Sequence, residues 1–291
     1  MRLFFRFLAW LGLPSNHAVG ALLGRLFFLV TPGWRQRTRE NLAASGLAQG
    51  EDKVRRLMRE NVKEIGKGAS ELAWALFRRP EEICALVRSL DGWEEVERLR
   101  AESRPILFVI PHLGGYDIAG RFLWTRLPIL AMYRPQKLAW LDALMREGRN
   151  RGAAPDGSNI APANMAGVRM LLRHLRGGGC SVILPDQVPG DGDGEWVEFF
   201  GRPAYTMTLP ARLQQASGAA IVFCYAERLA RSEGFRMHFR ALDTPLPQDR
   251  ATAARLVNAE VERMVRACPT QFLWGYNRYR KPARGPARPG T

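Results

Sequence analysis

Short apolar runs of strand length recur along this chain and are separated by stretches with helical spacing. The runs lie at Ile106–Ile110, Ile129–Tyr133, Ser181–Leu184 and Ala219–Ala226. Strands that alternate with helices build a sheet that is largely parallel and covered by helices on both faces. The alternating run Phe235–Ala241 adds an edge or half-exposed strand. We therefore expect an α/β fold with a mixed, largely parallel sheet flanked by helices.

Apolar residues at helical spacing predict a long amphipathic helix over Glu51–Phe77, which Pro80 ends. A shorter helix is expected from Glu81 to Val87. Further helices are predicted at Ile118–Trp124, Leu138–Glu147, Met165–Leu175, Thr208–Ala216 and Arg255–Ala267. The polar, Gly/Pro-rich segments Asn150–Pro162 and Gly190–Trp196 are predicted as loops.

The N-terminal stretch "MRLFFRFLAWLGLPSNHAVGALLGRLFFLV" is rich in Phe, Leu and Trp and is interrupted by a few basic residues. Basic residues among aromatic ones favour an interfacial membrane anchor. A buried core helix and a single tilted span over Phe7–Val30 are the alternatives. The arginines that follow, Arg35, Arg37 and Arg39, suit anionic headgroups on the cytoplasmic side.

The charge balance is strongly basic, with 43 Lys and Arg residues against 28 Asp and Glu residues and a net charge of +15. Such a balance implies an anionic partner. The sequence shows no P-loop or RNA-binding signature, and we expect no nucleic acid. Four cysteines stand singly without ligand spacing, so neither a metal site nor a disulfide framework is indicated.

The stretch "FVIPHLGGYDIAG" places a histidine and a carboxylate close to the end of a predicted strand. Sites in open α/β sheets form at the carboxyl ends of strands. Gly114 and Gly115 let the turn fold tightly, so that Asp117 can reach back and orient His112 as a general base. A purely structural His–Asp cap is the alternative. The backbone N–H groups of the two glycines, or a nearby arginine, are candidate donors to an oxyanion.

Other catalytic signatures are absent from the sequence. There is no G-x-S-x-G elbow, no H-E-x-x-H pair and no cysteine in a catalytic setting. The aspartates of "DQVPGDGDGEWVEFF" do not match a calcium-binding loop. The residues therefore favour a base-and-orienter pair that acts without a protein nucleophile.

Five motifs, in this order, carry a resemblance to a known family. They are "H-x-x-x-x-D" after a strand, "MYRPQK", "LPDQVPG", "VEFFGRPA" and "QFLWGYNRYRK". The chain resembles the bacterial late lipid A acyltransferases, the lauroyl and myristoyl transferases, within the glycerolipid-acyltransferase-like superfamily. The resemblance covers nearly the whole chain. One position departs from it, because Leu138 follows the lysine of "YRPQK" where relatives often carry asparagine.

The resemblance implies an acyltransferase that moves a fatty acyl chain from acyl carrier protein to a hydroxyl of a lipid A precursor. The reaction would occur at the cytoplasmic face of the inner membrane, with acyl carrier protein, an anionic glycolipid and the membrane surface as partners. No metal and no bound cofactor would be needed. His112 would be the general base and Asp117 its orienter. The residues that would bind substrate are Arg134, Lys137, Asp186, Gln187, Gly114 and Gly115.

The division of the chain follows from the same interpretation. Residues 1–30 are expected to anchor the protein, 31–281 to form the acyltransferase catalytic domain, and 282–291 to be a disordered basic tail. Phe199 and Phe200 are expected in the core or in an acyl groove. The aromatic and basic residues of the C-terminal motif are expected to form a membrane-interface or headgroup patch; they are Trp274, Tyr276, Arg278, Tyr279, Arg280 and Lys281.

Two further hypotheses stay open at this point. The same chemistry could act on a lysophospholipid, an ornithine lipid or another glycolipid. More distantly, the protein could be a basic membrane-binding protein without catalysis.

Overall fold

The computed structural model of the protein describes residues 2–133, 135, 138–150, 159–190 and 192–282. Two predicted substrate-binding residues, Arg134 and Lys137, lie outside the described residues, as does all but the first residue of the predicted tail.

Among the described residues, seven strands form one sheet in the order β1-β9-β8-β2-β5-β3-β4. The pairs are parallel, except that β8 and β9 are antiparallel. The strands are β1 (Val87–Asp91), β2 (Ile106–Val109), β3 (Ile129–Tyr133), β4 (Ile160–Pro162), β5 (Cys180–Ile183), β8 (Ala220–Arg228) and β9 (Phe235–Ala241). The four apolar runs of the sequence are β2, β3, β5 and β8. The predicted α/β fold with a mixed, largely parallel sheet is confirmed.

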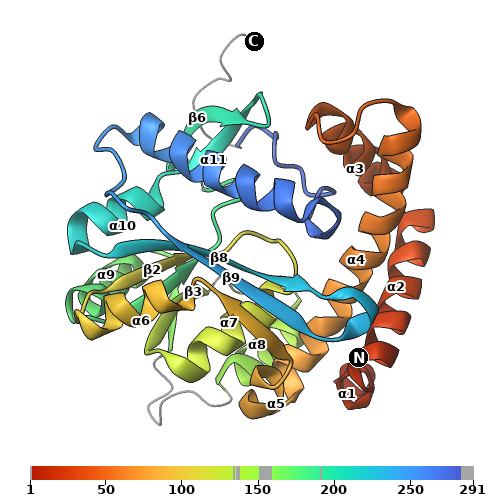
Figure 1. Cartoon of the computed structure of the whole chain (residues 1–291), viewed down its shortest axis with the longest axis horizontal. Coiled ribbons are helices and arrows are strands. Elements are labelled where there is room, and N and C mark those ends of the chain that lie inside the picture. The colour runs from red at the N-terminus through yellow and green to blue at the C-terminus, as the bar shows by residue number, and fades with distance from the viewer. Residues whose placement is uncertain (1, 134, 136–137, 151–158, 191, 283–291) are drawn as a thin grey trace.

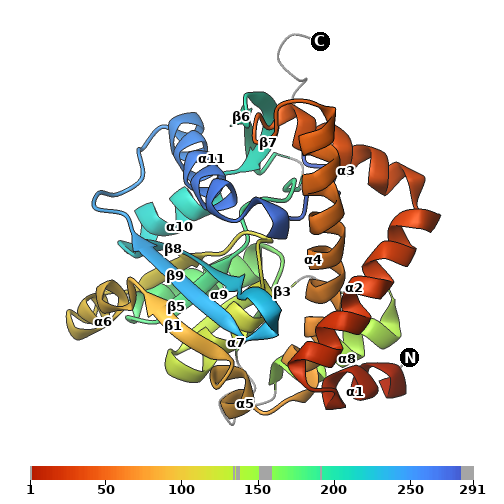
Figure 2. The same cartoon turned by 45° about the vertical axis from the view of Figure 1, so that its right-hand side comes forward.

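Helices cover both faces of this sheet (Figures 1 and 2). The helices on one face are α9 (Met165–Arg176), α10 (Leu209–Ser217) and α11 (Arg250–Ala267). Those on the other face are α5 (Pro80–Cys84), α6 (Trp93–Ala101) and α7 (Tyr116–Arg126). Because both faces are covered, β2 is buried along its whole length, with Leu107 in the first core and Phe108 in the second.

Several short elements differ from the prediction. The helix expected from Glu81 to Val87 ends at Cys84, and Val87 begins β1. The two predicted loops contain β4 and the start of a hairpin, β6 (Gly194–Phe199) and β7 (Arg202–Met207). These strands are short or half-exposed, so they lack the continuous apolar run that marked the central strands. The strand β9 is half-exposed as expected, but β1 covers its outer edge.

The long helix α4 (Glu51–Phe77) stands beside the sheet and joins it to the N-terminal helices (Figure 2). Acidic side chains at Glu51 and Asp52 favour its first turn, where the helix dipole is positive. The helix ends before Pro80, which disfavours helical backbone in the residue that precedes it. Packed against α4 are α1 (Arg2–Trp10), α2 (Leu13–Val30), α3 (Pro32–Ala44) and α8 (Ala139–Asn150).

Glycines bring α2 and α4 into direct backbone contact. A Cβ on Gly66 of α4 would lie 2.0 Å from the carbonyl oxygen of Gly20, and one on Gly24 would lie 2.4 Å from that of Val62. Within the described residues, α2 is also the helix that is long and apolar enough to cross a membrane by length and composition. One side of this apolar helix is therefore already packed tightly against protein.

Candidate active site

His112 lies on a sharp turn directly after β2. Gly114 has a φ of +62°, and a Cβ there would lie 1.9 Å from the carbonyl oxygen of Ala226 on β8. The next residue, Gly115, precedes α7, and a Cβ there would lie 2.6 Å from the ring of Phe235. Both glycines are thus needed because the turn presses directly against the neighbouring strand and its side chains.

The Asp186 carboxylate holds His112 at two points. Oδ1 lies 2.8 Å from the imidazole Nδ1, and Oδ2 accepts the backbone N–H of His112 at 3.0 Å. Asp186 is only 5% exposed. It follows β5, which pairs in parallel with β2, so the ends of these two strands bring the residues together. The carboxylate can only accept, so Nδ1 carries the proton and Nε2 is left with its lone pair.

The electrostatics of the pair favour a charged imidazole. Burial has the largest single influence and by itself lowers the pKa of His112. The charge and hydrogen bond of Asp186, with a smaller contribution from the charge of Asp117, outweigh burial and raise the pKa of His112 above its ordinary value. Burial likewise raises the pKa of Asp186, but His112 reverses that effect and leaves the pKa lowered. The arrangement therefore stabilises the imidazolium that forms when the ring takes a proton.

Asp117 lies in the first turn of α7, beside the same cavity as His112. The structure thus brings together the two residues of the predicted pair. The imidazole Nδ1 donates to Asp186, a residue that the sequence predicts to bind substrate. His112 and Asp186 are 74 positions apart in the sequence, and the pairing of β2 with β5 makes them neighbours.

Gln187 approaches the other ring nitrogen of His112. Its amide Nε2 lies 3.1 Å from the imidazole Nε2 and can donate to the lone pair there. The ring of Tyr116 lies beside the imidazole, with centroids 4.9 Å apart. The Gln187 amide therefore lies directly in front of the imidazole Nε2 of His112.

The N–H groups of the two glycines have partners inside the fold. Gly114 donates to the carbonyl oxygen of Gln271 at 3.1 Å, and Gly115 donates to that of Ala226 at 2.8 Å. These bonds anchor the turn. The arrangement gives no support to the expectation that these N–H groups bind an oxyanion.

A cavity of about 330 Å³ opens beside His112. Its wall is mainly apolar and comes from α4, α7 and the strands β3 and β5; it includes Ala75, Leu76, Ile110, Trp124, Ala131, Met132, Val182 and Leu184. Arg121 of α7 also lines it and is only 4% exposed. No sequence motif marks Arg121, although it lies one helical turn after Asp117 and is the one charged residue within Ile118–Trp124. The cavity combines an apolar wall, a base and a buried cation.

The C-terminal motif is largely internal. Trp274 is 2% exposed and Arg278 is 3% exposed. Arg278 donates to the carbonyl oxygen of Tyr205 and to the hydroxyl of Thr206, and burial lowers its pKa. The predicted headgroup patch is therefore wrong for Trp274 and Arg278, which form a scaffold behind Asp186. The sequence could not predict this burial, because buried segments and membrane-interface segments can have the same aromatic and basic composition.

Neighbours of the same scaffold are buried or half-buried. Burial raises the pKa of Tyr279 to about 12, and its hydroxyl donates to the carbonyl oxygen of Phe199. Phe199 and Phe200 lie in the core rather than along the cavity.

Across the part of the chain that the structure describes, no three His, Cys, Asp or Glu side chains gather as a metal site would require.

Comparison with known proteins extends these observations. The chain is 28% identical to a lipid A biosynthesis acyltransferase of Haemophilus influenzae over 246 residues, which cover 84% of this chain and 70% of the relative. It is 24% identical to the lipid A biosynthesis palmitoleoyltransferase of Escherichia coli, over 93% of this chain and 88% of the relative. It is 25% identical to the lipid A biosynthesis lauroyltransferase of the same organism, over 97% of this chain and 94% of the relative. The family model for bacterial lipid A biosynthesis acyltransferases matches residues 2–281, so the chain belongs to this acyltransferase family.

Proposed function

We propose that this protein transfers a fatty acyl chain from the thioester of acyl carrier protein to a hydroxyl of a lipid A precursor, with His112 as the general base. The observation that carries the proposal is the His112 imidazole at an apolar cavity, with its Nδ1 held by a buried carboxylate. The names of the relatives support the acceptor class.

The reaction proceeds by direct attack. Nε2 of His112 takes the proton of the acceptor hydroxyl while that oxygen adds to the thioester carbonyl carbon. The tetrahedral intermediate then collapses, the carbon–sulfur bond breaks, and the imidazolium returns the proton to the leaving thiolate. Asp186 stabilises the imidazolium between these two steps. The Gln187 amide stands where the hydroxyl must approach and can donate to the reacting oxygen.

The cavity wall fits a hydrocarbon chain. Side chains from α4, α7, β3 and β5 enclose an apolar space that begins at His112. Burying methylene groups against such a wall contributes about 0.8 kcal/mol for each one. The acyl chain of the donor therefore enters this cavity, and its carbonyl carbon lies near Nε2.

The charge and surface of the protein fit the expected partners. A net charge of +15 suits an acidic carrier protein and a phosphorylated glycolipid. Exposed apolar residues on α1 and α2 include Leu3, Trp10, Leu26 and Leu29. We place the protein at the cytoplasmic face of the inner membrane, where both substrates would meet it.

The first test is activity with purified components. The protein is incubated with an acyl carrier protein thioester and a lipid A precursor, and the products are identified by mass spectrometry. His112→Ala should lower the rate by at least about a hundredfold, the usual scale for losing a general base. His174→Ala is the matched control, because His174 lies on α9 and contacts the carbonyl oxygen of Pro128. Full activity of the His112 variant would rule out the proposed base.

Two further readouts separate the alternatives. Lipids from a deletion strain are compared with those of the parent, and we expect a lipid A species that lacks one acyl chain. A missing acyl chain on a phospholipid or an ornithine lipid instead would assign the enzyme to that acceptor. Incubation with the donor alone should leave the mass of the protein unchanged, whereas an added acyl mass would show a covalent intermediate and contradict direct attack.

A further inference from the structure

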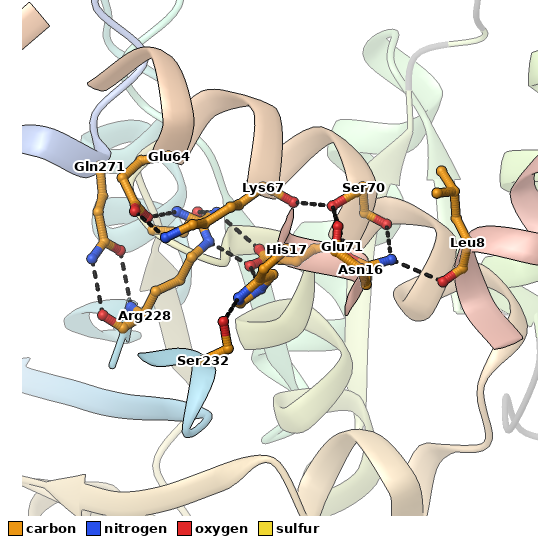
Figure 3. Close-up of polar contacts among 11 residues, drawn as sticks. Leu8, Asn16, His17, Glu64, Lys67, Ser70, Glu71, Arg228, Ser232 and Gln271 are labelled. Atoms are coloured by element: carbon orange, nitrogen blue, oxygen red, sulfur yellow. Dashed lines mark hydrogen bonds and ion pairs between the residues drawn. The ribbon is translucent and has the colours of Figure 1, made fainter. Parts of the chain in front are cut away.

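A buried chain of polar and charged residues crosses from α2 through α4 to the end of β8 (Figure 3). His17 and Glu71 have side chains that are each 2% exposed, and that of Arg228 is 3% exposed. The imidazole Nε2 of His17 lies 2.7 Å from Glu71 Oε1. Arg228 then grips the same carboxylate with two donors, Nε and Nη2, the second at 2.8 Å from Oε2. Three elements far apart in the sequence are thus tied through one carboxylate.

The chain continues to the turn that carries His112. Arg228 Nη2 also donates to the carbonyl oxygen of Gly114 at 2.8 Å. The side chain of Gln271 pairs with both the backbone N–H and the backbone carbonyl of Arg228, at 2.9 and 3.0 Å. The backbone carbonyl of Gln271 in turn accepts the N–H of Gly114. The carbonyl of His112 accepts the N–H of Leu273 at 3.2 Å. Three backbone groups of the turn, the carbonyls of His112 and Gly114 and the N–H of Gly114, are therefore held by Arg228 and the 271–273 segment.

Stability alone does not explain this arrangement. A buried ion pair often stabilises a fold no more than well-packed apolar residues of the same volume would. Only a guanidinium offers the fork of donors that can grip a carboxylate and still reach a carbonyl oxygen. The combination suits a residue that must fix a backbone position.

We infer that Glu71 and Arg228 are positioning residues that hold the turn of His112 against Asp186. His17 makes α2 part of the same hydrogen-bonded network. This inference rests on the proposed function of His112. It implies that the apolar N-terminal helix is a structural component of the active site and not a detachable anchor. Loosening the network should move the imidazole away from its carboxylate partner.

The sign of the expected effect follows from the groups around His112. Asp186 and Asp117 face the ring, Arg121 lines the same cavity, and Arg278 lies behind Asp186. Asp186 raises the pKa of His112 while burial lowers it. When the turn loosens, the contribution of Asp186 weakens and burial remains, so the pKa of His112 falls.

The test uses Arg228→Lys in the full-length protein. Lysine keeps the positive charge next to Glu71 but cannot grip the carboxylate with two donors and reach Gly114 at once. The protein has four histidines, so selective isotope labelling gives four imidazole signals whose titration can be followed by NMR. We expect the pKa of His112 to fall by about one unit and kcat to fall about tenfold. KM for the acyl donor should not change, because the cavity is not altered.

Ser70→Ala is the matched control. Ser70 lies on the same helix and donates to Asn16 Oδ1 of α2 at 2.7 Å, one position from Glu71 but without contact to the turn (Figure 3). This variant should lower stability and leave the titration of His112 unchanged. An unchanged pKa of His112 in Arg228→Lys, or an equal shift in Ser70→Ala, would overturn the inference.

His17→Phe provides a second variant in case Arg228→Lys does not fold. Phenylalanine keeps the ring that packs edge-on against Phe235 and removes both contacts, to Glu71 and to Ser232. We expect the His112 pKa to fall here as well, by less than in Arg228→Lys. The NMR titration needs no substrate, so absence of acyl transfer by the wild-type protein would refute the proposed function and leave this measurement valid.

Discussion

At the scale of single residues, His112 combines burial with two nearby carboxylates. Asp186 fixes the tautomer through Nδ1, and Asp117 adds negative charge beside the same cavity. A base arranged in this way is active when neutral and loses activity as pH falls through its raised pKa. The rate should therefore fall on the acidic side, below a midpoint that lies above the ordinary histidine pKa.

Asp186→Asn should change that pH dependence in a defined direction. The amide removes the charge that raises the pKa of His112, and burial continues to lower it, so the acidic limb of kcat/KM moves to lower pH. The plateau rate should fall by roughly a hundredfold or more, because the imidazolium loses its partner. Asp117→Asn should move the limb in the same direction by less, since its charge is the weaker contribution. An acidic limb that stays in place in Asp186→Asn would contradict this assignment.

The sequence could predict part of this site because its parts are local. His112 and Asp117 follow one strand, so their spacing alone places both at one edge of the sheet. The contact of His112 with Asp186 depends on the pairing of β2 with β5, which the sequence does not display. The pair of Glu71 and Arg228 joins a helix to a distant strand, and no motif marks it.

At the scale of elements, α7 follows the turn of His112 and forms a wall of the cavity along its length. Gly120 lies on the wall, and a Cβ added there would meet no atom within 4 Å. Glycine in the middle of a helix lowers stability by about 1 kcal/mol relative to alanine. Its presence at an open position keeps space free in the cavity.

Gly120→Leu should therefore shorten the acyl chain that the enzyme accepts. A leucine side chain fills part of the space of about 330 Å³, so the enzyme should prefer donors with at least two fewer carbons. The measurement is a competition among acyl carrier protein thioesters of different length, read by mass spectrometry of the product. Gly120→Ala is the control, with higher stability and little change in preference. The same preference in Gly120→Leu and wild type would place the acyl chain elsewhere.

The elements themselves were predictable in proportion to their burial. The central strands β2, β3, β5 and β8 appear as apolar runs because both sheet faces are covered. The edge strand β4 has three residues and contains Pro162, so it resembles the loop that was predicted there.

At the scale of the whole molecule, α1 and α2 lie on the side of α4 that faces away from the sheet (Figure 1), and both carry exposed apolar side chains. Leu26 is 49% exposed and Leu29 is 68% exposed, whereas His17 is buried against α4. Crossing a bilayer would pull α2 away from α4 and leave buried polar groups without partners. We therefore expect α2 to lie in the membrane interface while it stays packed on the protein.

Vesicle binding tests this orientation with two paired variants. Leu26→Glu/Leu29→Glu should weaken binding to vesicles of phosphatidylethanolamine and phosphatidylglycerol by at least about tenfold, since burying one leucine contributes about 1.5–3 kcal/mol. Ala216→Glu/Gln248→Glu adds the same charge at an exposed position on α10 and at another just before α11, two helices that pack on the sheet, and should leave apolar docking intact. Neither pair should change stability by more than about 1 kcal/mol, because the sites are exposed.

Alkaline carbonate should extract a helix that lies in the interface, whereas a helix that spans the bilayer would stay in the membrane. Equal binding by both double variants, or resistance to carbonate, would contradict interfacial docking through α2.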